Sequence, residues 1–288
     1  MLHKNFIAAF LALALVTMAC GININLPETQ LKTGPTVEDE ITIADPKSED
    51  AVSLSLAFGA GELNLSPGSD DMLVSGTATY NVEDFKPKVN EDSEPYTVEQ
   101  GNLQINGIPN FTDDIINRWD LTIGQMPLEL KIQAGAYSGN FDFGGLSIKR
   151  LEIADGAAKV NLNFSEPNQA ELEVFEYTTG ASNVSLEGLG NANIKAMTFR
   201  SGAGSYRLDF NGELQQDAEV YVESGISSVV IVVPEGVQAE VIFEGGMANV
   251  DYYGEWEHEG DKYVQGSEGP MIQIVVKMGA GNLELRNR

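Results

Sequence analysis

The 288-residue sequence is poor in the side chains on which metal sites and many enzymes depend. It contains one Cys and two His, one of which is His3. A single Cys excludes a disulfide framework and any multi-cysteine zinc site, and two His leave little material for His-based catalysis. Basic residues are also scarce, with 17 Lys and Arg against 43 Asp and Glu, so the net charge is -26. This charge repels phosphate backbones, and we expect no nucleic-acid partner.

Long apolar runs are missing except at the N-terminus. Residues 6–19 are apolar apart from Thr17, and they follow the basic residue Lys4. A basic start, a short apolar stretch and a small residue before the cleavage point predict a secretory signal peptide over residues 1–19. The stretch is shorter than the roughly 20 apolar residues that a transmembrane helix needs. We therefore expect an extracytoplasmic protein.

The only Cys of the chain, Cys20, directly follows this leader. Bacterial lipoproteins carry the lipid-modified cysteine at this place, so we expect lipid on Cys20 to anchor the mature chain to a membrane face. Thr17 stands where such sites usually carry Leu, and cleavage without lipidation therefore stays open as an alternative. Residues 20–50 combine several Pro with many polar residues and little apolar periodicity. We expect this segment to be a flexible tether.

A repeated pattern dominates the rest of the chain. Each repeat is centred on a glycine. Two apolar residues lie five and three positions before the glycine, and two more lie four and six positions after it. The pattern is centred on Gly59, Gly135, Gly156, Gly180, Gly202, Gly225, Gly246 and Gly279. Apolar residues two apart are typical of a strand with one buried face, and glycine permits turn conformations that other residues avoid. Each repeat therefore predicts a strand, a corner and a second strand.

The spacing of the repeats predicts how they assemble. From Gly135 to Gly246 the successive intervals are 21, 24, 22, 23 and 21 residues. A near-constant period indicates a repeat architecture in which each unit stacks on its neighbour. We therefore predict an all-β fold, a single parallel β-solenoid of about eight coils over residues 51–288. A meander of hairpins that closes as a sandwich is the alternative, because a two-strand unit with a Gly turn also fits a hairpin.

Two insertions interrupt the array. The first lies between Tyr80 and Trp119, and its residues 112–116 combine a capping residue with acids, which predicts a short helix. The second lies between Gly246 and Gly279, where the gap grows to 33 residues. Insertions in repeat proteins lie on one face, often the face that binds.

The end of the array is a second point of interest. The last coil finishes at Leu285, so few residues remain to cap it. A terminal coil exposes unpaired backbone groups that can pair with another molecule. We therefore expect weak end-to-end self-association.

The candidate ligand surface consists of polar residues on the outer face and aromatic residues of the second insertion. It comprises Asn140, Asp142, Asn161, Asn163, Tyr253, Trp256 and Tyr263. The polar group, together with Ser185 and Glu187, has oxygen ligands for a sugar or a weakly bound Ca²⁺, although asparagines that bond along the stack are the favoured explanation. The aromatic group would stack on sugar rings, whereas Tyr252 takes a core position. We expect no cofactor, metal site or catalytic residues, because His258 has no partner for either chemistry.

Three segments carry a family resemblance. They are Leu54–Leu65 with its Gly-Ala-Gly turn, Asn117–Ile123 with its Trp-Asp-Leu core, and Pro127–Ile132. Together they resemble the toast-rack family, which includes a domain of unknown function often found in bacterial lipoproteins. The chain also resembles, more distantly, adhesin-type β-solenoids and the C-terminal domains of cell-wall-active antibiotic response proteins. The resemblance implies a stacked β-solenoid without known catalytic residues.

These observations predict a non-catalytic lipoprotein of the bacterial cell envelope. We expect it to act as a binding, adhesin-like or scaffold module whose partner is an envelope protein or a glycan. Two alternatives stand beside this prediction. One is an envelope-stress or antibiotic-response signalling component, which rests on the resemblance alone. The other is an enzyme acting on polysaccharide, since parallel β-helices include such enzymes.

Overall fold

The computed structural model describes residues 28–29, 33–101, 108–109 and 115–287. The chain forms two compact units, residues 1–32 with 103–114 and residues 33–102 with 115–288. In the first unit the described residues form two short strands, β1 (Glu28–Thr29) and β7 (Ile108–Pro109), which pair in parallel. The expected signal peptide and Cys20 lie outside the described residues. The second unit contains all eight repeats.

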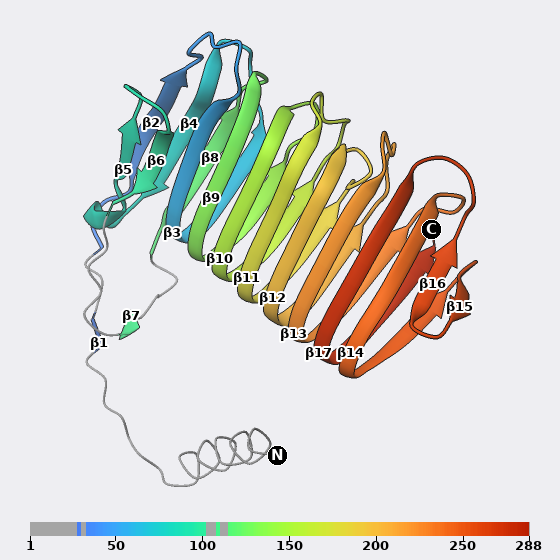
Figure 1. The fold of residues 1–288 in the computed structure, drawn as a ribbon. Helices are drawn as coiled ribbons and strands as arrows, with labels where there is room; N and C mark the ends of the chain where they lie inside the picture. The colour runs from blue at the N-terminus through green and yellow to red at the C-terminus, as the bar shows by residue number, and fades with distance from the viewer. Residues whose placement is uncertain (1–27, 30–32, 102–107, 110–114, 288) are drawn as a thin grey trace, which may run out of the picture. The chain divides into compact units, whose positions relative to one another are not determined.

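Eight strands of 16 or 17 residues build the second unit. They stack in parallel in the order β3, β9, β10, β11, β12, β13, β17, β14 (Figure 1). Their bounds are Val52–Pro67 (β3), Pro127–Asp142 (β9), Ser147–Asn163 (β10), Leu172–Glu187 (β11), Ile194–Asp209 (β12), Ala218–Val233 (β13), Gln238–Tyr253 (β14) and Met271–Asn287 (β17). The parallel pairing confirms the predicted solenoid and excludes the meander of hairpins.

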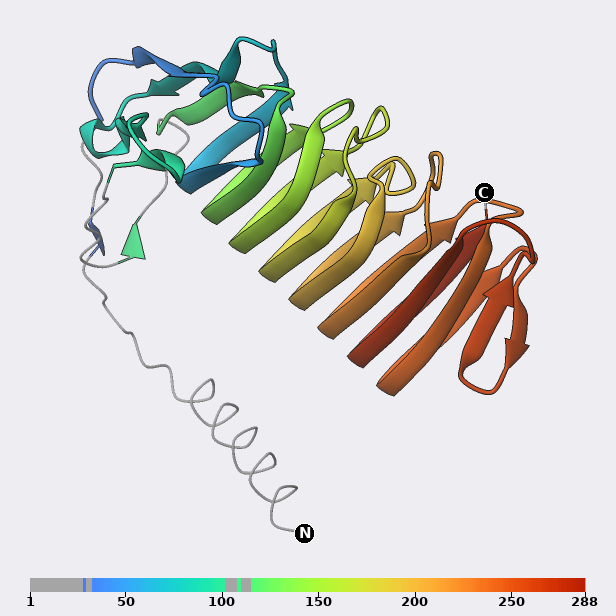
Figure 2. The same cartoon turned by 45° about the horizontal axis from the view of Figure 1, so that its top comes forward.

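Each repeat glycine lies in the middle of one long strand, where the strand bends and divides into two arms (Figure 2). The register aligns equivalent residues of successive coils, so that Leu54 pairs with Leu130 and Leu130 with Leu151. These residues are buried, and so is Leu63 in the arm that follows the bend of β3. The two arms of each coil therefore enclose one continuous core, as the apolar positions of the repeat predicted.

The glycines at the bends serve a purpose different from the predicted one. A Cβ atom at Gly135 would lie 2.3 Å from the carbonyl oxygen of Gly59 in the adjacent coil. Close stacking of the bends, rather than a special turn conformation, therefore requires glycine there. Positive φ occurs instead two residues later, at Gly61 (129°) and Gly281 (128°), where only glycine is free of steric strain.

The order of the last two coils differs from the order of the sequence. Strand β17, the C-terminal strand, lies between β13 and β14. The expectation that the coil ending at Leu285 is the exposed terminal coil is therefore wrong. The repeat pattern is the same in every coil, so it predicts that a segment forms a coil without predicting its place in the stack. The terminal coil is β14, and the second insertion forms a hairpin beside it, β15 (Glu257–Glu259) and β16 (Lys262–Gln265).

Strands from the first insertion and the N-terminal segment cover the opposite end of the stack. Strand β6 (Tyr96–Gln100) pairs with the first arm of β3, and β8 (Asn117–Ile123) pairs with the second. Strand β5 (Pro87–Asn90) pairs with β6, and β4 (Met72–Tyr80) pairs with β8. A short 3₁₀ helix, Glu83–Phe85, joins the two groups, whereas the helix expected at residues 112–116 falls largely outside the described residues.

The tether expected over residues 20–50 is too long. Strand β2 (Val37–Ala44) pairs antiparallel with β4 and completes the covered end. Ile41 and Ile43, two residues apart, place their side chains in the core. One alternating pair is enough to fix a short strand on an existing sheet, although it is a weak signal in a polar segment. In the part of the chain that the structure describes, no helix is long and apolar enough to cross a membrane.

Candidate functional site

The polar residues predicted on the outer face form a ladder along the stack. Asn161 donates from Nδ2 to Oδ1 of Asn140 at 3.3 Å, and Asn140 donates in the same way to Asn64 at 3.0 Å. Asn64 in turn donates to Oδ1 of Asp120 at 2.8 Å. Each amide is thus engaged with the neighbouring coil. This arrangement agrees with the structural alternative for Asn140 and Asn161.

Asp142 supports a turn rather than an open ligand position. Its Oδ1 accepts from the backbone N–H of Gly144 at 3.0 Å, and its Oδ2 accepts from the hydroxyl of Ser165 at 2.8 Å. Both partners lie in the loops that follow adjacent coils. Asn163 lies apart from this turn contact, in a groove lined by the loops of five coils.

The predicted aromatic platform is mostly buried. Trp256 and Tyr263 are each only 6% exposed, and the ring of Tyr263 stacks on His258 with centroids 4.5 Å apart. Burial raises the pKa of Tyr263. Tyr253 is 57% exposed, and Tyr252, expected in the core, is 44% exposed. The expectation of open stacking surfaces is therefore wrong for Trp256 and Tyr263. Tyr263 lies in β16, which pairs with the first arm of β14, and its ring lies 5.4 Å from that of Tyr252 in the second arm.

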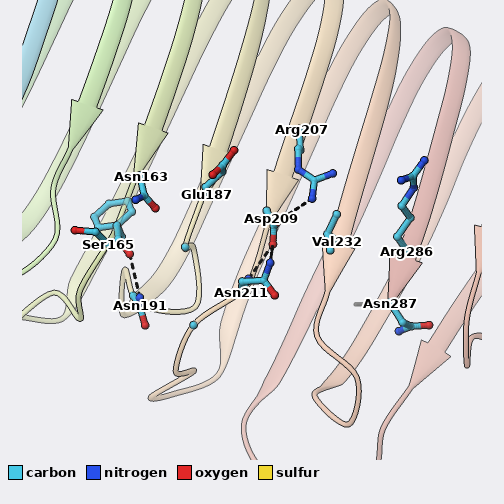
Figure 3. Close-up of a pocket in the computed structure, with 13 residues that line it drawn as sticks. Asn163, Ser165, Glu187, Asn191, Arg207, Asp209, Asn211, Val232, Arg286 and Asn287 are labelled. Carbon is cyan, nitrogen blue, oxygen red and sulfur yellow. Dashed lines mark hydrogen bonds and ion pairs between the residues drawn. The ribbon is translucent and has the colours of Figure 1, made fainter.

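A groove of about 680 Å³ crosses the loop ends of β10, β11, β12, β13 and β17 (Figure 3). Its polar and charged lining residues are Asn163, Ser165, Glu187, Asn191, Arg207, Asp209, Asn211, Arg286 and Asn287. The solenoid brings them together because each coil ends its second arm at the same level and then turns into a polar loop. Figure 3 shows Arg207 and Arg286 on either side of Val232.

Part of the groove is held rigidly by hydrogen bonds. Arg207 donates from Nη2 to Oδ2 of the buried Asp209 at 2.5 Å, and Oδ1 of Asp209 accepts from the backbone N–H of Asn211 at 3.1 Å. Asn191 donates to the carbonyl oxygen of Phe164 at 3.0 Å and accepts from the N–H of Glu213 at 2.9 Å. These contacts fix the loops that form the groove wall.

Other groups in the groove have capacity to bind a ligand. The guanidinium of Arg286 bonds to Glu284 through Nε, and half of its side chain remains exposed. The carboxylate of Glu187 is exposed and accepts from the hydroxyl of Ser185 at 3.1 Å. The Nδ2 atom of Asn287 is buried without a hydrogen-bond partner, although its Oδ1 accepts from the N–H of Glu255 at 2.7 Å. Donors and acceptors are thus presented side by side.

The groove combines charged groups of both signs with amides. Two guanidinium groups and two carboxylates nearly balance, and four side-chain amides add both donors and acceptors. Within the described residues, no three His, Cys, Asp or Glu side chains are grouped so that they hold a metal ion. Of the groove residues, the sequence analysis singled out Asn163 and Glu187. The available signal was that Arg207 and Arg286, among few basic residues, occur at the outward positions of their repeats.

A second polar cluster, which the sequence pattern did not predict, lies inside the core. Asp155 accepts from the hydroxyl of Tyr177 at 2.7 Å and from that of Tyr137 at 3.4 Å. It also accepts from the hydroxyl of Thr179, which donates to Ser182 at 2.6 Å. Burial raises the pKa of both tyrosines, and the charge of Asp155 adds to this effect. Its hydrogen bonds join three adjacent coils, β9, β10 and β11, around the partly buried Asp155.

Comparison with known proteins identifies the family. The family model for the N-terminal domain of toast_rack, DUF2154, matches residues 32–187, which is more than half of the chain. The chain belongs to the toast-rack family. The match includes the covered end of the stack and the first four long strands, β3 and β9 to β11. No curated protein matches this toast-rack chain.

Two solved structures are similar to this toast-rack solenoid at low identity. One is a proposed cell-adhesion protein from Clostridium sporogenes, with 16% identity and a TM-score of 0.47 over 88% of this chain and 100% of the other. Another is a proposed adhesin from Parabacteroides merdae, with 11% identity and a TM-score of 0.44 over 90% of this chain and 98% of the other.

Proposed function

We propose that this toast-rack chain is a non-catalytic binding module of the bacterial cell envelope, anchored through lipid on Cys20. The observation that carries its binding role is the groove across five coils, with its exposed Glu187 and Arg286 and the unpaired Nδ2 of Asn287. A buried donor without a partner costs stability, and a ligand oxygen would offset that cost.

The groove favours an extended, uncharged and hydroxyl-rich ligand, and a glycan is the ligand we propose. Its length along the stack matches a chain of linked units better than a single compact molecule. The strongly acidic protein repels polyanions, whereas amides, guanidinium and carboxylate groups all bond to sugar hydroxyls.

The test is binding to an array of oligosaccharides, followed by calorimetry with the sugar that the array selects. We expect Arg286→Ala and Glu187→Ala each to weaken binding about tenfold, as loss of one hydrogen bond to a charged group does. Arg150→Ala is the matched control, because Arg150 is a partly exposed arginine of β10 outside the groove. Circular dichroism checks that each variant keeps its fold.

Three results would contradict this proposal. The first is an array without any bound sugar, and the second is equal binding by the groove variants and the control. Cleavage of the selected sugar, seen by mass spectrometry, would contradict the non-catalytic part. Membrane fractionation tests the anchor separately, because Cys20→Ser should release the chain from the membrane if lipid holds it there.

A further inference from the structure

The terminal coil has one arm whose outer edge is open. Residues Met247–Tyr253, here called the open arm, pair with β17 on their inner side. On the outer side, β16 pairs only with Ala239–Ile242 of the other arm. None of the strands in the described residues pairs with the outer edge of the open arm. Its outward N–H and C=O groups therefore lack a strand partner.

The core is only partly covered at the same place. In the adjacent coil, Leu283 and Leu285 have no exposed surface. Their counterparts in the open arm are Val250, which is partly exposed, and Tyr252, which is 44% exposed. The ring of Tyr252 already lies against those of His258 and Tyr263, with centroids 5.7 and 5.4 Å away. Another strand on this edge would cover the surface of both side chains that remains exposed. Met247, 83% exposed, extends the apolar surface toward the bend.

The other edge strands of the sheet carry residues that discourage pairing. Strand β2 contains three consecutive acids, Glu38–Glu40, and β15 contains two Glu around His258. Strand β5 begins with Pro87 and Lys88. Charge and proline are the usual protection of an exposed edge. The open arm has neither, apart from Asp251, although the whole chain is strongly acidic.

We propose that two copies of this chain pair through their open arms in an antiparallel register centred on Val250. In this register Met247 lies opposite Tyr253 and Ala248 opposite Tyr252. Asn249 lies opposite Asp251, so the only charged residue faces an amide. Apolar pairs and the absence of facing like charges make the segment complementary to itself. The pairing would also satisfy the open backbone groups of both copies.

The rest of the fold limits this association to a dimer. At the far end of the stack both arms of β3 are already paired, so coils cannot add head to tail. A surface that pairs with its own copy gives a closed twofold dimer rather than a fibre. Within the second unit, β2 lies at the end opposite β14 (Figure 1). The two copies would therefore place their covered ends far apart, and the inference is independent of the groove.

The test is sedimentation equilibrium of the chain from residue 21 onward, which retains every described residue. We expect a monomer–dimer equilibrium. Asn249→Asp places like charges opposite each other and should weaken the dimer about tenfold, whereas Asn249→Lys faces Asp251 and should strengthen it by a similar factor. The control is Asn183→Asp, which adds the same charge at an exposed residue three positions after Gly180, as Asn249 is after Gly246.

Opposite responses to the two substitutions at Asn249, with Asn183→Asp near the wild type, support the proposed pairing. A chain that is monomeric up to millimolar concentration overturns it. A dimer that is insensitive to both Asn249 substitutions also overturns it, since the contact would then lie elsewhere. Equal weakening by Asn183→Asp and Asn249→Asp overturns the register, because general charge repulsion would explain both.

Discussion

At the N-terminal end of the stack both arms of β3 have strand partners on their outer side, whereas at the opposite end only the first arm of β14 has one among the described residues. Five strands, β2, β4, β5, β6 and β8, cover the first end, and the hairpin of β15 and β16 lies at the other. Trp119 is fully buried at the first end, while Tyr252 is 44% exposed at the second. A solenoid exposes the same kind of edge at each end, so the two ends of this one differ in how much of that edge is covered.

The two ends also differ in whether the backbone edge of the terminal coil is protected or open to a partner. The additional strands at the covered end provide both backbone partners and apolar cover for the first coil. At the other end, the hairpin protects one arm and leaves its neighbour open. We interpret the covered end as the structural cap of the fold and the open arm as its contact surface.

The largest expected difference between the ends comes from their core aromatics. Trp119 packs edge to face on Phe58 with ring centroids 5.0 Å apart. We expect Trp119→Ala to lower the free energy of unfolding by about 3–5 kcal/mol, as truncation of a buried aromatic does. Tyr252→Ala at the open arm should lower it by about 1 kcal/mol or less, because much of that ring is already in water.

Equilibrium unfolding in urea measures both losses. Trp119→Phe is the matched control, since it retains a ring and removes the buried indole N–H that has no hydrogen-bond partner. We expect its loss to be well below that of Trp119→Ala. Equal losses for Trp119→Ala and Tyr252→Ala would show that the two ends contribute alike to stability.

The second prediction compares the bends near the two ends. A Cβ at Gly135 would lie 2.3 Å from the carbonyl oxygen of Gly59, whereas a Cβ at Gly246 would lie 3.0 Å from that of Gly279. We expect Gly135→Ala to destabilise the fold by about 2–3 kcal/mol, because the coils must separate. Gly246→Ala should cost about 1 kcal/mol, since the terminal coil moves more easily. Thermal unfolding distinguishes these values, and similar melting temperatures would contradict the close-approach explanation.

The third and smallest effect concerns alkaline pH at the covered end. Burial raises the pKa of Tyr80 to about 12, and the hydrogen bond from its hydroxyl to Asp39, 2.7 Å long, contributes further. The folded state therefore favours the neutral phenol. Its stabilising contribution is fully present below pH 10, the approximate pKa in the unfolded chain, and is lost as pH rises through about 12.

The measurement is the free energy of unfolding of the wild type and of Tyr80→Phe across this pH range. We expect the wild type to lose more stability between pH 9 and about 11.5 than the variant does. Other buried tyrosines titrate in both proteins, so the difference between the two curves isolates Tyr80. Parallel curves would show that the phenol of Tyr80 ionises as easily in the folded protein as in the unfolded one.

The sequence predicted the repeat well because its signals are local and recur. Apolar residues two apart and one glycine per period are enough to define a coil, and all eight repeat glycines lie within long strands. The strand at Ile41 and Ile43 was missed because a single alternating pair in a polar segment is a weak signal. The order of β14 and β17 was missed because every coil carries the same pattern.

The groove residues likewise divide into those whose position the repeat pattern predicted and those whose position it did not. Its residues come from the ends of five coils and are separated by more than a hundred positions in the chain, from Asn163 to Asn287. The outward positions of Arg207 and Arg286 followed from the repeat. The contribution of Asn191 and Asn211 did not, because both lie in irregular loops. The path of the first loop depends on Phe164 of the neighbouring coil, and the second is held by Asp209 of its own coil.

By itself, the sequence determined that this chain stacks into a parallel solenoid, since a repeated apolar pair has few other ways to be buried. The tertiary structure alone decided which coil is terminal, which of its arms is open, and which polar side chains meet in the groove. These features depend on packing between segments that carry nearly identical patterns. A local pattern specifies how a segment is buried, but only contacts with its neighbours specify where it lies.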